Sequence, residues 1–213
     1  MMTYPIEVAG VNRELPLCKI TEDLYIGAFI CFGDAELTVA CAQELLKLVP
    51  AEEYDYLFTA EAKSIPLIHE MARQSGAEKY FIARKGPKAY MPDPIHVEDQ
   101  SITTAGVQKL YLGRDDADLI RGKRILIMDD VISTGGSLRA MEELVKIAGG
   151  TVVGKIAVLA EGDAQSREDI KFLAPLPLFN ADGTVKGLEG IYIICNSVQR
   201  TPCFSFRKAR RSS

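Results

Sequence analysis

Two neighbouring carboxylates and a loop rich in glycine and hydroxyl groups lie close together in the middle of the chain. Asp129 and Asp130 follow four apolar residues, and the sequence Ser-Thr-Gly-Gly-Ser occupies positions 133–137. Ionised carboxylates only accept hydrogen bonds, so an adjacent pair can hold the vicinal hydroxyls of a sugar but repels a phosphate. The loop offers unobstructed backbone N–H groups, hydroxyls and the positive end of a following helix, which suit a phosphate. The pattern therefore predicts a site for a sugar phosphate.

A buried strand and an amphipathic helix must hold these groups in place. Residues 125–128 are apolar without alternation, which is typical of a strand covered on both faces of a parallel sheet. Ligands bind at the carboxyl ends of such strands, so we expect the two carboxylates to end the strand and to be exposed. An ordinary strand, turn and helix with a solvated acid pair is the alternative interpretation. The helix is indicated by an apolar stripe that ends at a Gly-Gly pair, namely Leu138, Met141, Leu144, Val145 and Ala148 before Gly149 and Gly150.

The composition is that of a folded chain without a bias towards nucleic acid or membrane. Of 213 residues, 47% are hydrophobic and 25% charged, which excludes a disordered chain. The net charge of −4 gives no overall basic surface for nucleic acid, apart from the short basic segment 207–211. No apolar stretch approaches a membrane span and the start lacks a leader pattern, so we expect a cytoplasmic protein. The length fits a single α/β domain over residues 1–213.

The cysteines indicate neither a disulfide framework nor a zinc site. They are odd in number and include no Cys-x-x-Cys pair. We expect them to be buried, reduced thiols. The five are Cys18, Cys31, Cys41, Cys195 and Cys203.

Strand and helix patterns alternate through the middle of the chain, which favours an α/β fold. Asp34 is placed to cap the first helix, and a polar, proline-rich stretch is long enough to be a functional loop or lid. The expected elements are a helix over 35–48, a strand over 54–60, a helix over 64–73, a strand over 79–83, the loop over 86–104, a hairpin arm over 107–112, a strand over 151–160, a turn-rich excursion over 175–190 and a short strand over 191–195.

Residues 125–137 resemble the signature with which type I phosphoribosyltransferases bind 5-phosphoribosyl 1-pyrophosphate (PRPP). In that signature apolar residues, an acidic pair and a Thr-Gly-Gly-Ser/Thr loop follow in this order. The resemblance implies an α/β fold with a central, mostly parallel sheet flanked by helices. A small hood and appendage would come from the terminal segments, about residues 1–50 and 175–213. Asp129 and Asp130 would bind the ribose hydroxyls and act in catalysis. The 5′-phosphate would be bound by the loop that follows, which consists of Ser133, Thr134, Gly135, Gly136 and Ser137.

Two further segments resemble the pyrophosphate-binding parts of the family's adenine enzymes. Glu61, Ala62, Lys63 and Ser64 stand where Glu-Ala-Arg-Gly is usual, and a non-proline cis peptide is implied around Ala62-Lys63. Lysine keeps the charge of arginine but loses its bidentate fork. The second segment resembles an Arg-Lys-x-x-Lys sequence that is often lent across a dimer interface, so a homodimer is implied. A helix start with an exposed lysine, and a solvated charge run, are the alternative interpretations. The three cations of the second segment are Arg84, Lys85 and Lys88.

The resemblance places a flexible lid or hairpin over about residues 86–112 and a purine contact in the hood. The family's adenine enzymes carry a lid Glu-Tyr pair that is absent here, so Glu98 is the substitute acid/base candidate, with His96 as another. Phe32 could stack on the base, although a core position is the usual fate of a phenylalanine. Glu161 occupies a later contact region. No lysine stands beside Ala160, where the family's 6-oxopurine enzymes carry one, which favours adenine.

The leading hypothesis is therefore a purine phosphoribosyltransferase of the purine-salvage type. Adenine and PRPP would give AMP and pyrophosphate, with Mg²⁺ bound mainly through PRPP and no direct metal ligand from the protein. One alternative is a non-catalytic PRPP-sensing regulator of purine genes. Its DNA-reading segment would have to lie in the first 50 residues, which hold seven acidic and three basic residues, the wrong balance for a DNA reader. A xanthine, orotate or other base phosphoribosyltransferase is the third hypothesis.

Overall fold

The computed structural model describes residues 1–99 and 108–187. The predicted strand over 191–195, the basic segment 207–211, two of the five cysteines (Cys195 and Cys203) and the end of the predicted loop therefore lie outside the described residues. Helices and strands alternate from α1 (Ala35–Leu46) to β5 (Tyr80–Ala83) and from α3 (Arg114–Ile120) to β9 (Thr151–Glu161), and none of the described helices has the length and apolar character needed to cross a bilayer.

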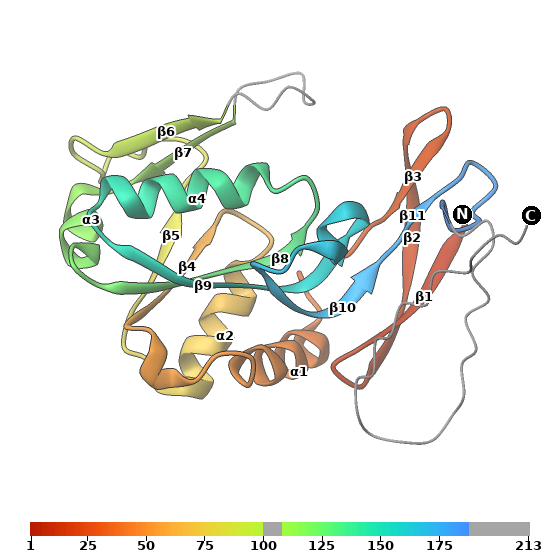
Figure 1. Cartoon of the computed structure of the whole chain (residues 1–213), viewed down its shortest axis with the longest axis horizontal. Helices are drawn as coiled ribbons and strands as arrows, with labels where there is room; N and C mark the ends of the chain where they lie inside the picture. The colour runs from red at the N-terminus through yellow and green to blue at the C-terminus, as the bar shows by residue number, and fades with distance from the viewer. Residues whose placement is uncertain (100–107, 188–213) are drawn as a thin grey trace, which may run out of the picture.

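A five-stranded sheet in the order β10-β9-β8-β4-β5 forms the centre of the molecule, and all its neighbouring strands are parallel (Figure 1). Helices α1 and α2 cover one face and α4 covers the other. This confirms the predicted α/β class and the βαβ unit. The elements are α1 Ala35–Leu46, β4 Tyr56–Ala60, α2 Ile65–Ser75, β5 Tyr80–Ala83, β8 Arg124–Ile132, α4 Gly136–Ile147, β9 Thr151–Glu161 and β10 Lys171–Leu176.

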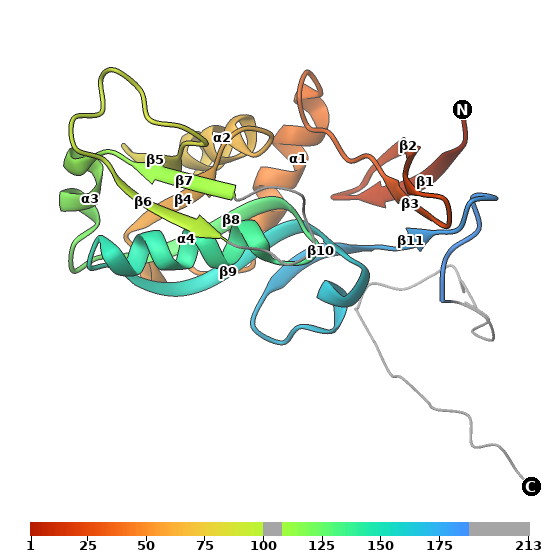
Figure 2. The same cartoon turned by 90° about the horizontal axis from the view of Figure 1, so that it is seen from above.

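A second, antiparallel sheet stands at one end of the molecule and forms the predicted hood (Figure 2). Three of its strands come from the start of the chain and the fourth from the segment after β10. The chain crosses from the hood into the core through residues 28–34, where Asp34 caps α1 by accepting the backbone N–H of Leu37 at 3.1 Å. Arg13 of the hood donates to both oxygens of Asp34 at 2.6 and 2.9 Å. The strands are β1 Thr3–Val8, β2 Val11–Thr21, β3 Leu24–Gly27 and β11 Leu178–Phe179.

A hairpin packs on α4 and is joined to the end of β5 by backbone hydrogen bonds between Arg84 and Tyr111. Its arms are β6 Ile95–Asp99 and β7 Gln108–Leu112, so the arm predicted over 107–112 is confirmed. The stretch predicted as a functional loop or lid over 86–104 contains β6, a strand that was not expected separately, and its Val97 is buried against the core. Two further elements of the core domain were not predicted. These are α3 Arg114–Ile120, which is short and charged, and β10, whose pattern is interrupted by Pro175.

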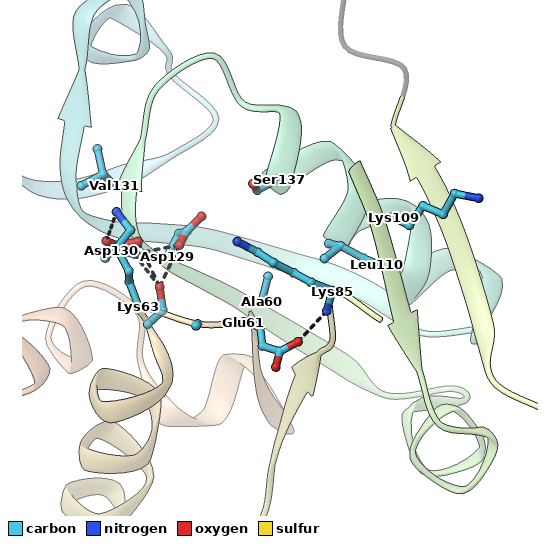
Figure 3. A pocket seen from close by; sticks show the side chains of 12 residues that line it. Ala60, Glu61, Lys63, Lys85, Lys109, Leu110, Asp129, Asp130, Val131 and Ser137 are labelled. Carbon is cyan, nitrogen blue, oxygen red and sulfur yellow. Dashed lines mark hydrogen bonds and ion pairs between the residues drawn. The ribbon is translucent and has the colours of Figure 1, made fainter. Parts of the chain in front are cut away.

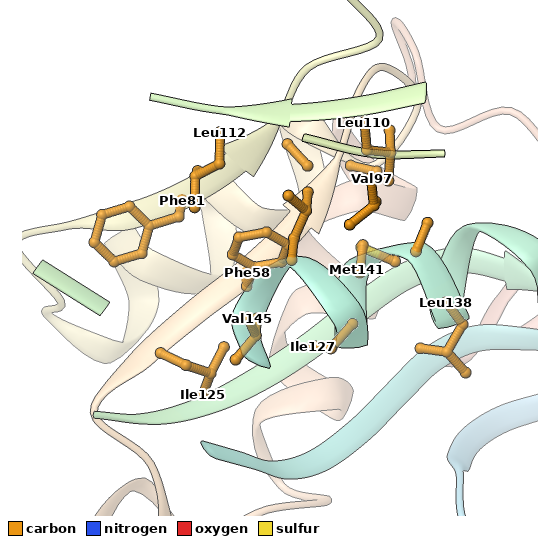
Figure 4. Close-up of a cluster of buried hydrophobic side chains, with 14 of the residues drawn as sticks. Phe58, Phe81, Val97, Leu110, Leu112, Ile125, Ile127, Leu138, Met141 and Val145 are labelled. Atoms are coloured by element: carbon orange, nitrogen blue, oxygen red, sulfur yellow. The ribbon is translucent and has the colours of Figure 1, made fainter. Parts of the chain in front are cut away.

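The core is divided by the central sheet into two layers, as expected for a strand covered on both faces. In β8, Ile125 and Ile127 pack with Phe58 and α4 on one side (Figure 4), whereas Leu126 and Met128 pack towards α1 and α2 on the other. Full burial of such a side chain contributes about 1.5–3 kcal/mol. The predicted stripe of α4 is buried throughout. The strand that carries the acid pair is therefore fixed from both faces.

The cysteine prediction is correct for two of the three cysteines in the described part of the chain. Cys31 and Cys41 are free and buried, and burial raises the pKa of each thiol to about 12, so both stay protonated. Cys18 is exposed, contrary to the prediction, because it lies on the outer side of the hood strand β2.

Candidate active site

A cavity of about 600 Å³ opens at the carboxyl edge of the central sheet (Figure 3). Four parts of the chain meet there, namely the loop from β4 to α2, the end of β5, the last part of β8 and the start of α4, with β7 closing one side. The lining residues are Ala60, Glu61, Ala62, Lys63, Ser64, Lys85, Lys109, Leu110, Asp129, Asp130, Val131 and Ser137. Eight of these twelve were predicted as site residues from the sequence.

The acid pair lies inside β8 and not at its end. The strand continues to Ile132, because Val131 and Ile132 keep pairing with β9. Asp130 is only 4% exposed, and Asp129 is half-buried. The prediction that both carboxylates are exposed at a strand end is therefore wrong, and their charge must be compensated inside the protein.

Hydrogen bonds from one serine help to compensate the acid pair. The Ser64 hydroxyl lies 2.8 Å from Asp129 Oδ1 and 3.2 Å from Asp130 Oδ1, and it accepts the backbone N–H of Asp130 at 2.9 Å. Burial, followed by the adjacent charge of Asp130, raises the pKa of Asp129, while the Ser64 hydroxyl and the Asp130 amide oppose that rise. Protonation of Asp129 is therefore easier than for an ordinary aspartate.

Lys63 supplies positive charge to the same pair. Its Nζ lies 2.8 Å from Asp130 Oδ2, an ion-pair distance without hydrogen-bond geometry. Half of the lysine side chain is exposed to the cavity, whereas Asp130 is almost wholly enclosed. A cation that touches both the buried acid and the open space is well placed to meet an anionic ligand.

The loop from β4 to α2 contains a non-proline cis peptide, as implied by the resemblance. The bond joins Glu61 and Ala62, one peptide earlier than expected. The Glu61 carboxylate faces the next strand, where it accepts the Lys85 N–H at 2.6 Å and pairs with Arg84 Nε at 3.0 Å. Burial raises the pKa of Glu61, but these partners outweigh that effect and lower it. The ionised carboxylate therefore holds the loop to the end of β5.

Of the three cations predicted to bind pyrophosphate at the end of β5, Lys85 alone lines the cavity. Figure 3 shows its side chain reaching across the opening towards the acid pair. Arg84 instead pairs with Glu61 and donates to the Tyr90 hydroxyl at 2.6 Å. Lys88 is not part of the lining. The cavity thus brings together Lys63 and Lys85, and the roles of Arg84 and Lys88 stay predictions.

The predicted phosphate loop leads directly into α4. Gly135 has a φ of +78°, and Ser137 in the first turn lines the cavity. Arg139 Nη1 donates to the Thr134 carbonyl at 3.1 Å across the loop. Arg167, which was not predicted, also lies close to the loop, and its Nη1 is 2.7 Å from the point that a Cβ on Gly135 would occupy. No local motif identifies Arg167, because it follows β9 some thirty residues later and its position depends on the fold.

The acid/base candidates lie on the hairpin beside the cavity. Glu98 of β6 forms an ion pair with Lys109 of β7, which lowers the pKa of Glu98. Lys109 lines the cavity and was not predicted. His96 stacks on Tyr111 with 5.3 Å between ring centroids and is exposed. Nothing tests the proton-transfer role of Glu98, which stays a prediction.

The two base-contact candidates differ in exposure. Phe32 is 48% exposed, so a core position is excluded for this ring. Its neighbour Cys31 is buried near Asp130 and Lys63, which brings the hood segment close to the acid pair. Glu161 is buried at the end of β9 and is hydrogen bonded to the Ser133 hydroxyl; burial raises its pKa against the effects of that bond and of Lys63.

Comparison with known proteins identifies the family. The model described as Phosphoribosyl transferase domain matches residues 41–176. The chain belongs to the phosphoribosyl transferase family. All the lining residues of the cavity fall within the matched part, so the prediction drawn from the acid pair and its loop is confirmed at the level of the family.

The curated relatives of this chain are named for different purine bases. The adenine phosphoribosyltransferase of Corynebacterium diphtheriae is 30% identical over 189 residues, which cover 86% of this chain and 100% of that enzyme. The adenine phosphoribosyltransferase of Corynebacterium jeikeium is 37% identical over 99 residues, 46% of this chain and 45% of that enzyme. A hypoxanthine/guanine phosphoribosyltransferase of Methanotorris igneus is 31% identical over 124 residues, 58% of this chain and 63% of that enzyme.

Solved structures confirm the phosphoribosyl transferase fold. The adenine phosphoribosyltransferase of Rhodothermus marinus aligns with a TM-score of 0.58 at 22% identity, covering 82% of this chain and 94% of that structure. This likeness extends beyond the central sheet into the terminal segments, which agrees with the predicted hood.

Proposed function

We propose that the chain transfers the phosphoribosyl group of PRPP to a purine base, with adenine as the base and AMP and pyrophosphate as products. The observation that carries this proposal is the charge distribution of the cavity. Two carboxylates lie between two lysines and the start of a helix, within one space of about 600 Å³. PRPP has the complementary pattern, since neutral hydroxyls stand between a 5′-phosphate and a diphosphate.

Each part of the cavity then has a task in the transfer. Asp129 and Asp130 accept hydrogen bonds from the ribose hydroxyls, and the loop at 133–137 binds the 5′-phosphate at the start of α4. Lys63 and Lys85 hold the diphosphate. When the bond from C1′ to the diphosphate oxygen breaks, the lysines stabilise the leaving group and the carboxylates stabilise the positive charge that develops on the sugar. The base nitrogen then bonds to C1′ and loses its proton, for which Glu98 is the candidate acceptor.

Magnesium fits this arrangement as an ion carried by the substrate. In residues 1–99 and 108–187 no three acidic, histidine or cysteine side chains are grouped as metal ligands, and the acid pair is already engaged by Ser64 and Lys63. Bound through the diphosphate, Mg²⁺ would supply charge neutralisation to the leaving group.

Adenine is favoured by two features. The full length of the adenine enzyme of C. diphtheriae aligns with this chain. In addition, Glu161 stands next to Ala160, where the hypoxanthine-type enzymes carry a lysine nearby. An ionised carboxylate accepts hydrogen bonds, so it suits the amino group of adenine and disfavours the oxygen of a 6-oxopurine. We propose Phe32 and Glu161 as base contacts on this ground.

The test is nucleotide formation by the full chain with PRPP and Mg²⁺, offering adenine, hypoxanthine, guanine, xanthine and orotate in turn. We expect AMP and pyrophosphate from adenine at the highest rate. A higher rate with another base contradicts the choice of adenine, and PRPP binding without turnover on any base would instead support the regulator hypothesis.

A pair of matched variants assigns the site in the same assay. Changing Asp129 and Asp130 together to Asn should weaken PRPP binding by about a hundredfold or more in calorimetry, because two charged acceptors are lost. The same change at the adjacent acids Asp115 and Asp116 of α3, which do not line the cavity, should leave binding unchanged. Unchanged PRPP affinity in the first variant contradicts the site.

A homodimer, a cytoplasmic location and a single domain over residues 1–213 stay predictions from the family resemblance and the sequence. Light scattering of the purified chain tests the first of these directly.

A further inference from the structure

Ser64 occupies the cap position of α2 but does not cap the helix. A serine at this position usually accepts a backbone N–H from the first turn of its own helix. Here the side chain makes no such bond. Its hydroxyl points instead at Asp129 and Asp130, to which it makes three contacts of 2.8, 2.9 and 3.2 Å. The side chain is thus used for the acid pair at the expense of the helix start.

The environment of Ser64 leaves its hydroxyl no other role among the described residues. The residue is 1% exposed, so its hydroxyl is largely shielded from bulk solvent. It has one proton and therefore donates to one carboxylate at a time, while its oxygen accepts the amide of Asp130. Ser64 is sixty-five residues from Asp129 in sequence, so the contact joins the proposed pyrophosphate loop to the proposed ribose site across the cavity floor.

We propose that Ser64 is a positioning residue that holds both carboxylates in the orientation in which they accept the ribose hydroxyls. This inference rests on the proposed function. Lys63, the preceding residue, holds the outer oxygen Asp130 Oδ2 at 2.8 Å, while Ser64 holds the inner oxygens. Two consecutive residues of the pyrophosphate loop thus orient the two acids of β8. In this position the family's adenine enzymes usually carry glycine, which has no hydroxyl to offer.

The proposal has a consequence for pH that a purely structural hydrogen bond lacks. The groups that face the pair are Lys63 and Ser64 from the loop, Cys31 from the hood segment, whose thiol is protonated, and Lys85 across the cavity. Donation from Ser64 favours the ionised form of Asp129. Loss of the hydroxyl therefore raises the pKa of Asp129 further, and the fall in sugar-phosphate binding at acidic pH begins at a higher pH.

The test uses ribose 5-phosphate as the probe and the full chain as the protein. Binding is measured by calorimetry from acidic to alkaline pH for Ser64→Ala and for Ser64→Thr, which keeps a hydroxyl. We expect Ser64→Ala to lose about tenfold in affinity, because a hydrogen bond to a charged group is removed, and to move the midpoint of the acidic limb upward. Ser64→Thr should stay close to the unchanged protein in both respects.

Thr59 provides the matched control. Its hydroxyl is fully buried in β4 and donates to the Met128 carbonyl at 2.8 Å, so it joins the same loop-bearing strand to β8 without contacting a carboxylate. Thr59→Val should lower the melting temperature and leave the pH midpoint of binding in place. An equal shift of the midpoint in Thr59→Val means that any loosening of β8 has this effect, and overturns the proposal.

Titration of the aspartate carboxyls by ¹³C NMR in the free protein provides a second measurement that does not depend on ligand binding. The expected result is a raised pKa for Asp129 in Ser64→Ala. Unchanged affinity, midpoint and carboxyl titration in that variant overturn the role of Ser64 alone. If the unchanged protein binds neither ribose 5-phosphate nor PRPP, the proposed function fails, and the carboxyl titration by itself then decides whether Ser64 orients the pair.

Discussion

At the scale of single residues, the acid pair shows how this chain places a ligand site at the expense of stability. Two adjacent carboxylates are enclosed at the sheet edge, and burial together with the charge of Asp130 raises the pKa of Asp129. A raised native pKa means that the folded state prefers the protonated form more than the unfolded chain does. The stabilisation present at acidic pH is therefore lost as the pH rises through the raised pKa, and at neutral pH the ionised Asp129 destabilises the fold.

Asp129→Asn should separate stability from binding. The amide is neutral, and its oxygen can still accept from Ser64 and from the Asp130 N–H, which both bond Asp129 Oδ1. We expect a melting temperature a few degrees above that of the unchanged protein at neutral pH, and a smaller difference at acidic pH. PRPP binding should be strongly weakened. A lower melting temperature at neutral pH contradicts this account of the carboxyl, and thermal denaturation at two pH values makes the comparison.

At the scale of elements, the turn from β8 into α4 places Gly135 close to two arginines, Arg139 and Arg167. Its φ of +78° lies in the left-handed region, where a side chain costs about 1–2 kcal/mol. Arg167 approaches so closely that a Cβ would lie 2.7 Å from its Nη1. Arg167 is itself held by two hydrogen bonds to Asp169, at 2.9 and 2.7 Å. The loop therefore requires glycine at position 135 for two reasons, namely the left-handed backbone conformation and the close approach of Arg167.

Gly135→Ala should lower both stability and affinity for ribose 5-phosphate, because the loop must move to admit the methyl group. Gly122 is a suitable control, since its φ is +72° and a Cβ there would meet no atom within 4 Å. Gly122→Ala should therefore lose only stability, by about 1–2 kcal/mol in denaturant unfolding. Combining Gly135→Ala with Arg167→Ala should restore part of the affinity. Equal binding losses in the two single glycine variants would show that the close approach of Arg167 is irrelevant.

The elements that could be predicted from sequence are those with local signals. The apolar run of β8 and the apolar stripe from Leu138 to Ala148 were enough to predict the strand, the loop and the helix at their correct positions. The enclosure of Asp130 could not be foreseen, because it depends on Ser64 and on pairing with β9. Arg167 was missed for the same reason. The short helix α3 and the proline-containing strand β10 have hydrophobic patterns too weak to distinguish them from loops.

At the scale of the whole molecule, the hood and the parallel sheet face each other across the crossing segment 28–34 (Figure 2). Phe32 lies in this segment with almost half of its side chain exposed, next to the buried Cys31. Since Cys31 lies near Asp130, we propose that the exposed ring of the next residue, Phe32, stacks on a base held between the hood and the core. In this proposal the two sheets bind different substrates, PRPP on the core and the base under the hood.

Phe32→Ala should raise KM for adenine by about tenfold, which corresponds to the usual contribution of one base stacked on an aromatic ring. PRPP affinity measured without base should not change. Val39→Ala on the outer face of α1 removes a similarly exposed apolar side chain and should alter neither quantity. Steady-state kinetics with varied adenine makes the measurement. An unchanged KM for adenine in Phe32→Ala contradicts the stacking role.

Asp34 limits how this part of the molecule can change by mutation. One carboxylate caps α1 and also holds Arg13 of the hood through two hydrogen bonds, two positions after Phe32. Asparagine would preserve the cap and lose the charge that holds Arg13. Glutamate would preserve the charge, but its longer side chain does not suit the cap. Aspartate meets both demands. A substitution at position 34 is therefore expected to affect the helix start, the attachment of the hood and the position of Phe32 together.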